Sequence, residues 1–149
     1  MIDRSDSVTI NRPVEEVFAY VTDTSNDPAW HTDILEAQKT SEGPIGIGTR
    51  WHLRFKPFMG TSDGNTEVVA FEPNRKEALS GAMGPMQPTL TYLFEPADGG
   101  TRFTRRVQIK VSGMMRLMEP FMQWVDAPKR NRRFVANLKR VLEQQAPRQ

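Results

Sequence analysis

One basic residue falls among apolar neighbours in the longest predicted strand, residues 101–111. Its sequence alternates, and Arg105 shares its phase with Phe103 and Val107. Alternate residues of a strand point to opposite faces of a sheet, so these three side chains are expected to face the core. A buried cation needs a charged partner or a polar cavity. We therefore expect Arg105 either to contact a carboxylate, phenolate or carbonyl of a bound molecule, or to form an internal ion pair.

Two acidic residues are candidate internal partners of Arg105, namely Glu67 and Glu95. With its side chain inward, Glu67 would be a general base with a raised pKa and would form an acid–base pair with Tyr92. The opposite strand phase makes Glu67 a surface residue, which we favour. A bulge in strand 101–111 would place Arg106 inward instead of Arg105.

The remaining candidates for chemistry are few. His52 alternates with arginines and is expected to point outward, while His31 follows Trp30 at a predicted helical turn, where a surface position is favoured over a site role. Tyr92 donates a hydrogen bond either into a pocket or to the protein itself. With no cysteine, two separated histidines and no Gly-x-Ser-x-Gly motif, we expect no catalytic nucleophile, no metal site and no cofactor.

A set of apolar residues is predicted to line the interior together with Arg105. The strand positions are Trp51, Leu53, Phe55, Tyr92, Phe94, Phe103 and Val107, and the positions on or beside a helical stripe are Met114, Met118 and Met122. Methionine adapts to irregular shapes, so this composition suits a pocket for varied apolar ligands. The alternative is that these side chains simply fill the core.

Two segments rich in glycine and proline are predicted to gate that interior. Residues 56–65 read as a turn or flap that carries Phe58 and Met59, and residues 81–88 read as a loop that carries Met86. Apolar residues in loops often close pockets. They also often tuck beneath their own loops, and the sequence leaves both readings open.

The elements that must position these residues follow from hydrophobic period and breakers. Asn11 is expected to cap a short helix that starts near Pro13, and a second helical turn is expected at 28–30. A long helix is expected over 114–145, with bends at Pro120 and Pro128. Strands are predicted at about 2–10, 34–40, 49–55, 66–71, 76–80, 89–95 and 101–111. Strands that follow one another through tight turns imply a largely antiparallel sheet packed on the long helix.

Short motifs in this order resemble a known family. They are INRPVEEVF at 10–18, PAWH at 28–31, GIGTRW at 46–51, FEPNR at 71–75, YLFEP at 92–96, GGTRF at 99–103 and NLKRVL at 137–142. The chain resembles the START-related polyketide cyclase/dehydrase and lipid-transport superfamily (SRPBCC). The resemblance implies the α+β helix-grip fold: a curved antiparallel sheet of about six to seven strands wraps a long C-terminal helix, with two short helices after the first strand. It also implies a cavity for apolar ligands, but no shared catalytic motif.

Composition sets the remaining expectations. The 149 residues suit one domain, 1–149, with a net charge of +2. Bases are concentrated in 128–149 without interleaved aromatic residues, so we expect a solvated helix face and no nucleic-acid partner. No segment is apolar enough to span a membrane, and no signal peptide is evident, so a cytoplasmic location is expected. The oligomeric state, monomer or homodimer, stays open.

These patterns favour one function over two rivals. We expect a non-catalytic protein that binds or transports a small hydrophobic molecule, such as a lipid, polyketide or aromatic compound, in a cavity between the sheet and the C-terminal helix. A cyclase or dehydratase that uses the same cavity is the first alternative. A protein-interaction module is the second.

Overall fold

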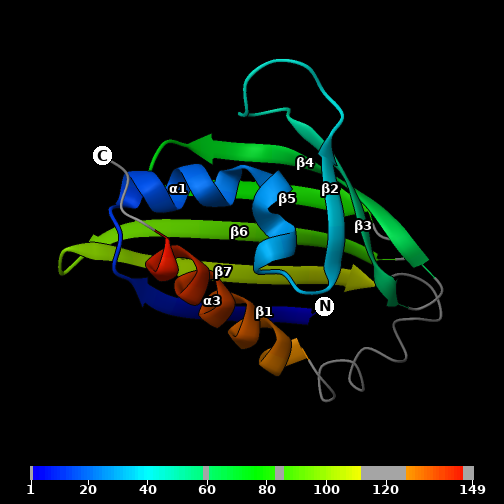
Figure 1. Ribbon diagram of the computed structural model, residues 1–149. Coiled ribbons are helices and arrows are strands. Elements are labelled where there is room, and N and C mark those ends of the chain that lie inside the picture. The colour runs from blue at the N-terminus through cyan, green and yellow to red at the C-terminus, as the bar shows by residue number, and fades with distance from the viewer. Residues whose placement is uncertain (1, 59–60, 83–85, 112–126, 146–149) are drawn as a thin grey trace.

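The computed structural model describes residues 2–58, 61–82, 86–111 and 127–145. Within these residues, seven strands form one antiparallel sheet in the order β1-β7-β6-β5-β4-β3-β2 (Figure 1). They are β1 (Ile2–Ile10), β2 (Ile34–Lys39), β3 (Arg50–Phe58), β4 (Thr61–Glu72), β5 (Lys76–Ala82), β6 (Met86–Ala97) and β7 (Gly100–Val111). From β2 to β7, each strand pairs with the next along the chain, and β1 returns to pair with β7.

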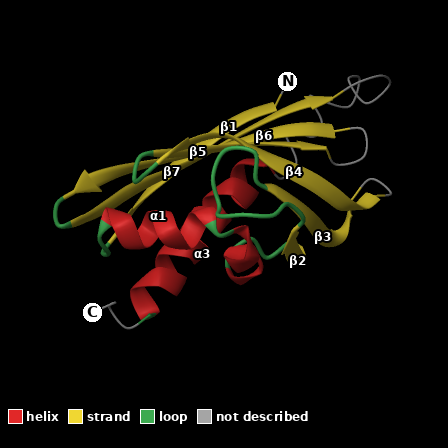
Figure 2. Cartoon of the chain, turned by 90° about the horizontal axis from the view of Figure 1, so that it is seen from above, coloured by secondary structure: helices red, strands yellow, loops and turns green. Residues whose placement is uncertain are grey.

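The described helical segments all lie on the concave face of the curved sheet (Figure 2). They are α1 (Val14–Thr22), the 3-10 helix η1 (Thr24–Ala29) and α3 (Ala127–Gln144). The expected α+β helix-grip fold is therefore confirmed. None of the helices in the described ranges is long and apolar enough to cross a membrane.

Alternating burial shows which face of each strand meets the helices. In β3, Trp51, Leu53 and Phe55 are buried, while Arg54 between them is exposed. Helix α3 buries residues at spacings of three and four, among them Phe134, Val135, Leu138 and Leu142. The two patterns meet on the concave face, so the core lies between sheet and helices.

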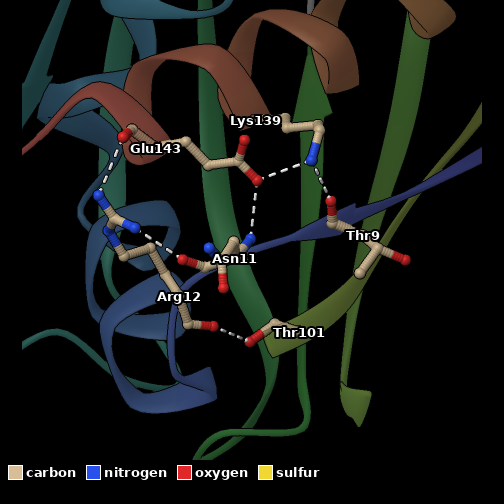
Figure 3. A network of polar contacts seen from close by, with 6 residues as sticks. All are labelled: Thr9, Asn11, Arg12, Thr101, Lys139 and Glu143. Carbon is tan, nitrogen blue, oxygen red and sulfur yellow. Dashed lines mark hydrogen bonds and ion pairs between the residues drawn. The ribbon is translucent and has the colours of Figure 1, made fainter. Parts of the chain in front are cut away.

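The last turns of α3 are attached to the junction between β1 and α1 (Figure 3). Glu143 Oε2 accepts hydrogen bonds from the backbone N–H of Asn11 at 2.8 Å and from Lys139 Nζ at 2.7 Å. Arg12 Nη2 donates to the carbonyl oxygens of Glu143 at 2.9 Å and Gln145 at 2.6 Å. Arg12 thus satisfies carbonyls that the end of a helix leaves without intrahelical donors.

Several predicted boundaries were wrong. The cap at Asn11 is absent, since Pro13 is the N-cap of α1 and makes no side-chain cap bond. Most of the predicted flap at 56–65 is strand, because β3 runs to Phe58 and β4 begins at Thr61. Strand β6 likewise begins at Met86, inside the predicted loop at 81–88. The long helix is described only from Ala127, so its predicted stretch at 114–126 lies outside the described residues.

Candidate functional site

A row of polar side chains crosses the centre of the concave face. In the strand pairing, Glu77 of β5 lies opposite Tyr92 of β6, Tyr92 lies opposite Arg105 of β7, and Arg105 lies opposite Asp6 of β1. Directly opposed residues in antiparallel strands share a face, with Cβ atoms about 5 Å apart. Glu77, Tyr92 and Arg105 are all buried. The fold therefore gathers two acids, a phenol and a guanidinium in one line beneath the helices.

Arg105 is held by partners from two helical regions. Its Nε donates a 3.0 Å hydrogen bond to His31 Nε2, and its Nη1 donates to Asn131 Oδ1 on α3. The guanidinium also lies 5.1 Å from the centre of the Phe134 ring, a cation–π distance. The inward position predicted for Arg105 is confirmed, but Glu67 and Glu95 are both exposed and are not its partners.

His31 is a neutral buried imidazole. Because Nε2 accepts a hydrogen bond from Arg105, the single ring proton lies on Nδ1, 3.3 Å from Asp27 Oδ2. Burial, and then the positive charge of Arg105, lower the pKa of His31 well below its usual value. The ring stacks on Trp30 with centroids 3.8 Å apart. The expected surface position of His31 was wrong, because η1 folds back onto the sheet.

Asn131 joins α3 to two strands. Its Nδ2 donates to Asp6 Oδ2 at 2.7 Å and to the carbonyl oxygen of Arg105 at 3.2 Å. Its Oδ1 accepts from the Arg105 guanidinium. A hydrogen-bonded chain thus runs from His31 through Arg105 and Asn131 to Asp6, with Asp27 Oδ2 3.3 Å from its His31 end, and it positions the segment after η1, β7, α3 and β1 against one another.

Glu77 and Tyr92 lie outside this chain, and none of their side-chain polar atoms has a hydrogen-bond partner among the described residues. Burial, with a smaller contribution from Asp27, raises the pKa of Glu77 to about 9. Burial also raises the pKa of Tyr92 far above its usual value. Arg105 is near enough to oppose part of that shift in Tyr92, yet no hydrogen bond of acceptable geometry joins it to Tyr92 Oη. Both groups are therefore neutral O–H donors at neutral pH.

Aromatic rings surround the polar row. Phe103 lies between Tyr92 and Phe94, with centroid distances of 5.6 and 5.4 Å, and Trp30 approaches it edge-on at 6.0 Å. Phe18 of α1 packs on Phe94 at 5.1 Å. Beyond the row, the same face of β6 and β7 continues with half-buried apolar residues, namely Leu90, Val107 and Ile109.

The predicted ligand-binding residues can now be located. Those buried on the concave face are Trp51, Leu53, Phe55, Tyr92, Phe94, Phe103 and Arg105, and Val107 is half-buried there. Of the predicted gate, Met86 is buried at the start of β6 rather than placed on a loop. Met59, Met114, Met118, Met122 and the side chain of Phe58 lie outside the described residues.

Other candidates lie away from this face. Glu67 is exposed, as favoured, and His52 is half-buried, with its Nε2 3.3 Å from Asp63 Oδ1. Glu67 therefore does not pair with Tyr92. Arg106 points outward, where its Nη2 lies 2.8 Å from Asp3 Oδ2, so the register slip did not occur. In the parts of the chain that the structure describes, no three potential ligands cluster as a metal ion would require.

Sequence reasoning missed Glu77, Asp27 and Asn131. Glu77 was readable in principle, because the β5 segment has one acid next to Ala78 and Leu79, which are buried. Asp27 and Asn131 carry no such signal. Their burial depends on how η1 and α3 dock on the sheet, which local patterns do not encode.

Comparisons with known proteins agree with the architecture. The family model for polyketide cyclase/dehydrase and lipid transport matches residues 1–143. A solved protein from Thermus thermophilus has a TM-score of 0.75 at 16% identity, over 97% of this chain and 100% of that one. A Deinococcus radiodurans protein has a TM-score of 0.68 at 22% identity, over 96% and 98%.

A third solved structure is the di-domain ARO/CYC protein BexL from the BE-7585A biosynthetic pathway. It has a TM-score of 0.67 at 13% identity, over 96% of this chain and 47% of BexL. At these identities the structural likeness shows a shared fold alone. None of the curated proteins compared with the chain matches it.

Proposed function

Since the chain belongs to the polyketide cyclase/dehydrase and lipid-transport family, we propose that it is one ligand-binding domain that holds a small hydrophobic molecule against the concave face of its sheet. The observation that carries this proposal is the make-up of that face. Trp30 and Phe103 pack around Tyr92, and Glu77 lies opposite Tyr92. Both Glu77 and Tyr92 are buried and have no hydrogen-bond partner among the described residues. Unpaired buried polar groups are costly, so a bound molecule or water is the expected partner.

The half-buried residues beyond the polar row extend the proposed binding surface. Leu90 lies opposite Val107, and Ile109 follows on the same face of β7. An apolar ligand laid along them would gain about 25 cal/mol for each Å² of apolar surface removed from water. The ligand would then meet Tyr92 and Glu77 at its inner end and aliphatic side chains along its length.

Native mass spectrometry of protein purified without denaturation tests the proposal. We expect a co-purified small molecule, released on unfolding, and saturable binding of the neutral dye N-phenyl-1-naphthylamine. Val107→Trp should weaken dye binding by about tenfold, because the larger ring occupies the proposed surface. Val69→Trp is the matched control, since Val69 is an exposed strand residue. Absence of both a co-purified molecule and saturable dye binding would reject the proposal.

A cyclase or dehydratase is the second candidate function. The observation that favours it is the direct opposition of Glu77 and Tyr92, two proton donors on one face. General acid catalysis requires such groups within reach of a substrate oxygen. If this candidate is correct, the protein converts a linear poly-β-ketone to a cyclised aromatic product by aldol addition and loss of water, and Glu77→Gln and Tyr92→Phe slow the conversion at least about a hundredfold. If the protein binds the poly-β-ketone but forms no product, the enzymatic candidate is rejected and the ligand-binding function is retained.

A further inference from the structure

The innermost part of the proposed binding surface has an unusual chemical character. Glu77 is fully buried and Tyr92 nearly so, and the strand pairing places them directly opposite each other. Neither Glu77 carboxyl oxygen nor Tyr92 Oη has a hydrogen-bond partner in the described ranges, and the same holds for the indole Nε1 of nearby Trp30. The ring centroids of Trp30 and Tyr92 are 5.9 Å apart. Among the described residues, the unpartnered buried groups on this part of the face are thus Glu77, Tyr92 and Trp30, with Nδ1 of His31 and Oδ1 of Asp27 beside them.

The protonation state of Glu77 determines what this place offers a ligand. Its raised pKa of about 9 keeps the carboxyl group protonated at neutral pH. A protonated carboxyl group donates one O–H, as a phenol does, whereas a carboxylate only accepts. The three groups therefore present O–H, O–H and N–H. The ligand atom that satisfies such a set is an acceptor oxygen.

Arg105, the adjacent cation, has two of its three side-chain nitrogens engaged by partners other than Glu77 and Tyr92. Its Nε and Nη1 donate to His31 and Asn131, and Asp6 lies opposite it and accepts from Asn131. A ligand carboxylate placed beside Glu77 would thus lose its hydration, while the Nε and Nη1 donors of Arg105 remain bonded to His31 and Asn131. The negative charge of such a ligand would also oppose ionisation of the two buried acids, Glu77 and Asp27. Burial of an uncompensated charge is far more costly than burial of a carbonyl group.

We propose that Glu77 and Tyr92 form a polar subsite that selects an uncharged ligand with a ketone or quinone oxygen and disfavours ligands that end in a carboxylate. The subsite rests on the proposed function, because it requires a molecule bound on the concave face. It narrows that function to neutral aromatic carbonyl compounds and away from free fatty acids. Arg105 then acts as a positioning residue of the polar chain rather than as the ligand's anion anchor.

Three probes of matched shape test the subsite: fluorene, 9-fluorenone and fluorene-9-carboxylate. Their dissociation constants are measured by calorimetry at pH 7 with wild-type protein, Tyr92→Phe, Glu77→Leu and Glu77→Gln. The readout is the ratio of the fluorene constant to the fluorenone constant, because a ratio cancels general effects of each substitution on the binding surface. Loss of one hydrogen-bond donor should lower the ratio by about fivefold in Tyr92→Phe and in Glu77→Leu.

The conservative variant separates a chemical role from a structural one. Glu77→Gln keeps an N–H donor, so its ratio should stay within about twofold of the wild-type ratio. The carboxylate should bind the wild-type protein at least about tenfold more weakly than fluorene. If the ratio is the same in all four proteins, or if the carboxylate binds most tightly, the proposed subsite is rejected but the proposed ligand-binding function is retained. If none of the three probes binds, the proposed function fails for aromatic ligands and the subsite fails with it.

Discussion

Arg105 Nε donates a 3.0 Å hydrogen bond to Nε2 of His31, a residue 74 positions away in the chain. This bond fixes the ring proton of His31 on Nδ1 and joins β7 to the segment after η1. Asn131 accepts from the same guanidinium, so that α3 is tied to the same point. The η1 region and α3 are thus positioned over the candidate site by one buried polar chain, and its members can be tested one by one.

Replacement of Arg105 should strongly destabilise the fold. Arg105→Leu leaves Nε2 of His31 and Oδ1 of Asn131 buried without their donor, at a cost of about 3 kcal/mol in the free energy of unfolding. Urea denaturation monitored by tryptophan fluorescence measures this change. Arg106→Leu is the matched control, since the neighbouring Arg106 is exposed and pairs with Asp3 at the surface. Equal midpoints for the two variants would contradict the role assigned to Arg105.

His31 should make stability depend on pH in the mildly acidic range. Its pKa in the folded protein is depressed, so the unfolded chain takes up the proton first as the pH falls. The stabilising contribution is complete above the unfolded value of about 6.5 and declines below it by about 1.4 kcal/mol per pH unit until the folded pKa is reached. His31→Gln should remove this slope between pH 6.5 and 5. Superimposable profiles for His31→Gln and for His52→Gln, a variant at a half-buried histidine, would refute the prediction.

Glu77 should act in the opposite direction. Because its folded pKa is raised to about 9, its neutral form is fully accommodated below the unfolded value, and stability is lost as the pH rises from there toward 9. Glu77→Gln removes the ionisable group at nearly constant volume. It should therefore raise the free energy of unfolding by about 2–3 kcal/mol at pH 7 and change it little at pH 4.

The control for Glu77 is Glu67→Gln on the neighbouring strand β4, where the side chain is exposed. That variant should show no comparable gain at pH 7. A Glu77→Gln protein that is less stable than wild type by the same amount at pH 4 and pH 7 would show that the carboxyl group has a structural partner and is not a free neutral acid.

Arg12 should control order at the end of α3. It donates to the carbonyl oxygens of Glu143 and Gln145, which have no donor within the helix. Arg12→Ala should increase amide hydrogen exchange over the last turns of α3 while β7 keeps its protection. Arg102→Ala, an exposed arginine on β7, serves as the control. Unchanged exchange at 140–145 in Arg12→Ala would count against this anchor.

Local sequence patterns predicted the sheet well and the polar site only in part. Alternation in β3 and β7 correctly placed Trp51, Phe103 and Arg105 on the inner face, because every second side chain of a strand points to the same face of the sheet. The same reasoning missed Glu77, because β5 does not alternate in burial: Glu77, Ala78 and Leu79 are all buried.

The partners of Arg105 could not be predicted from local sequence patterns, for a different reason. His31 follows a 3-10 helix that contains Pro28, and its burial depends on the docking of that segment over Phe103 and Tyr92. Asn131 lies on a helix whose basic composition suggested a solvated face. Tertiary contacts, rather than local period, decide which polar residues of such segments turn inward.

Two-dimensional NMR of the indole N–H groups during titration with 9-fluorenone tests the central claim most directly. The Nε1 atoms of Trp30 and Trp51 are buried and lack hydrogen-bond partners among the described residues, so they report on the concave face. We expect both signals to shift and saturate together. Saturable shifts confined to residues around the exposed side chains of Leu35, Ile47 and Val69, with both indole signals unmoved, would place the binding outside the concave face and contradict the account.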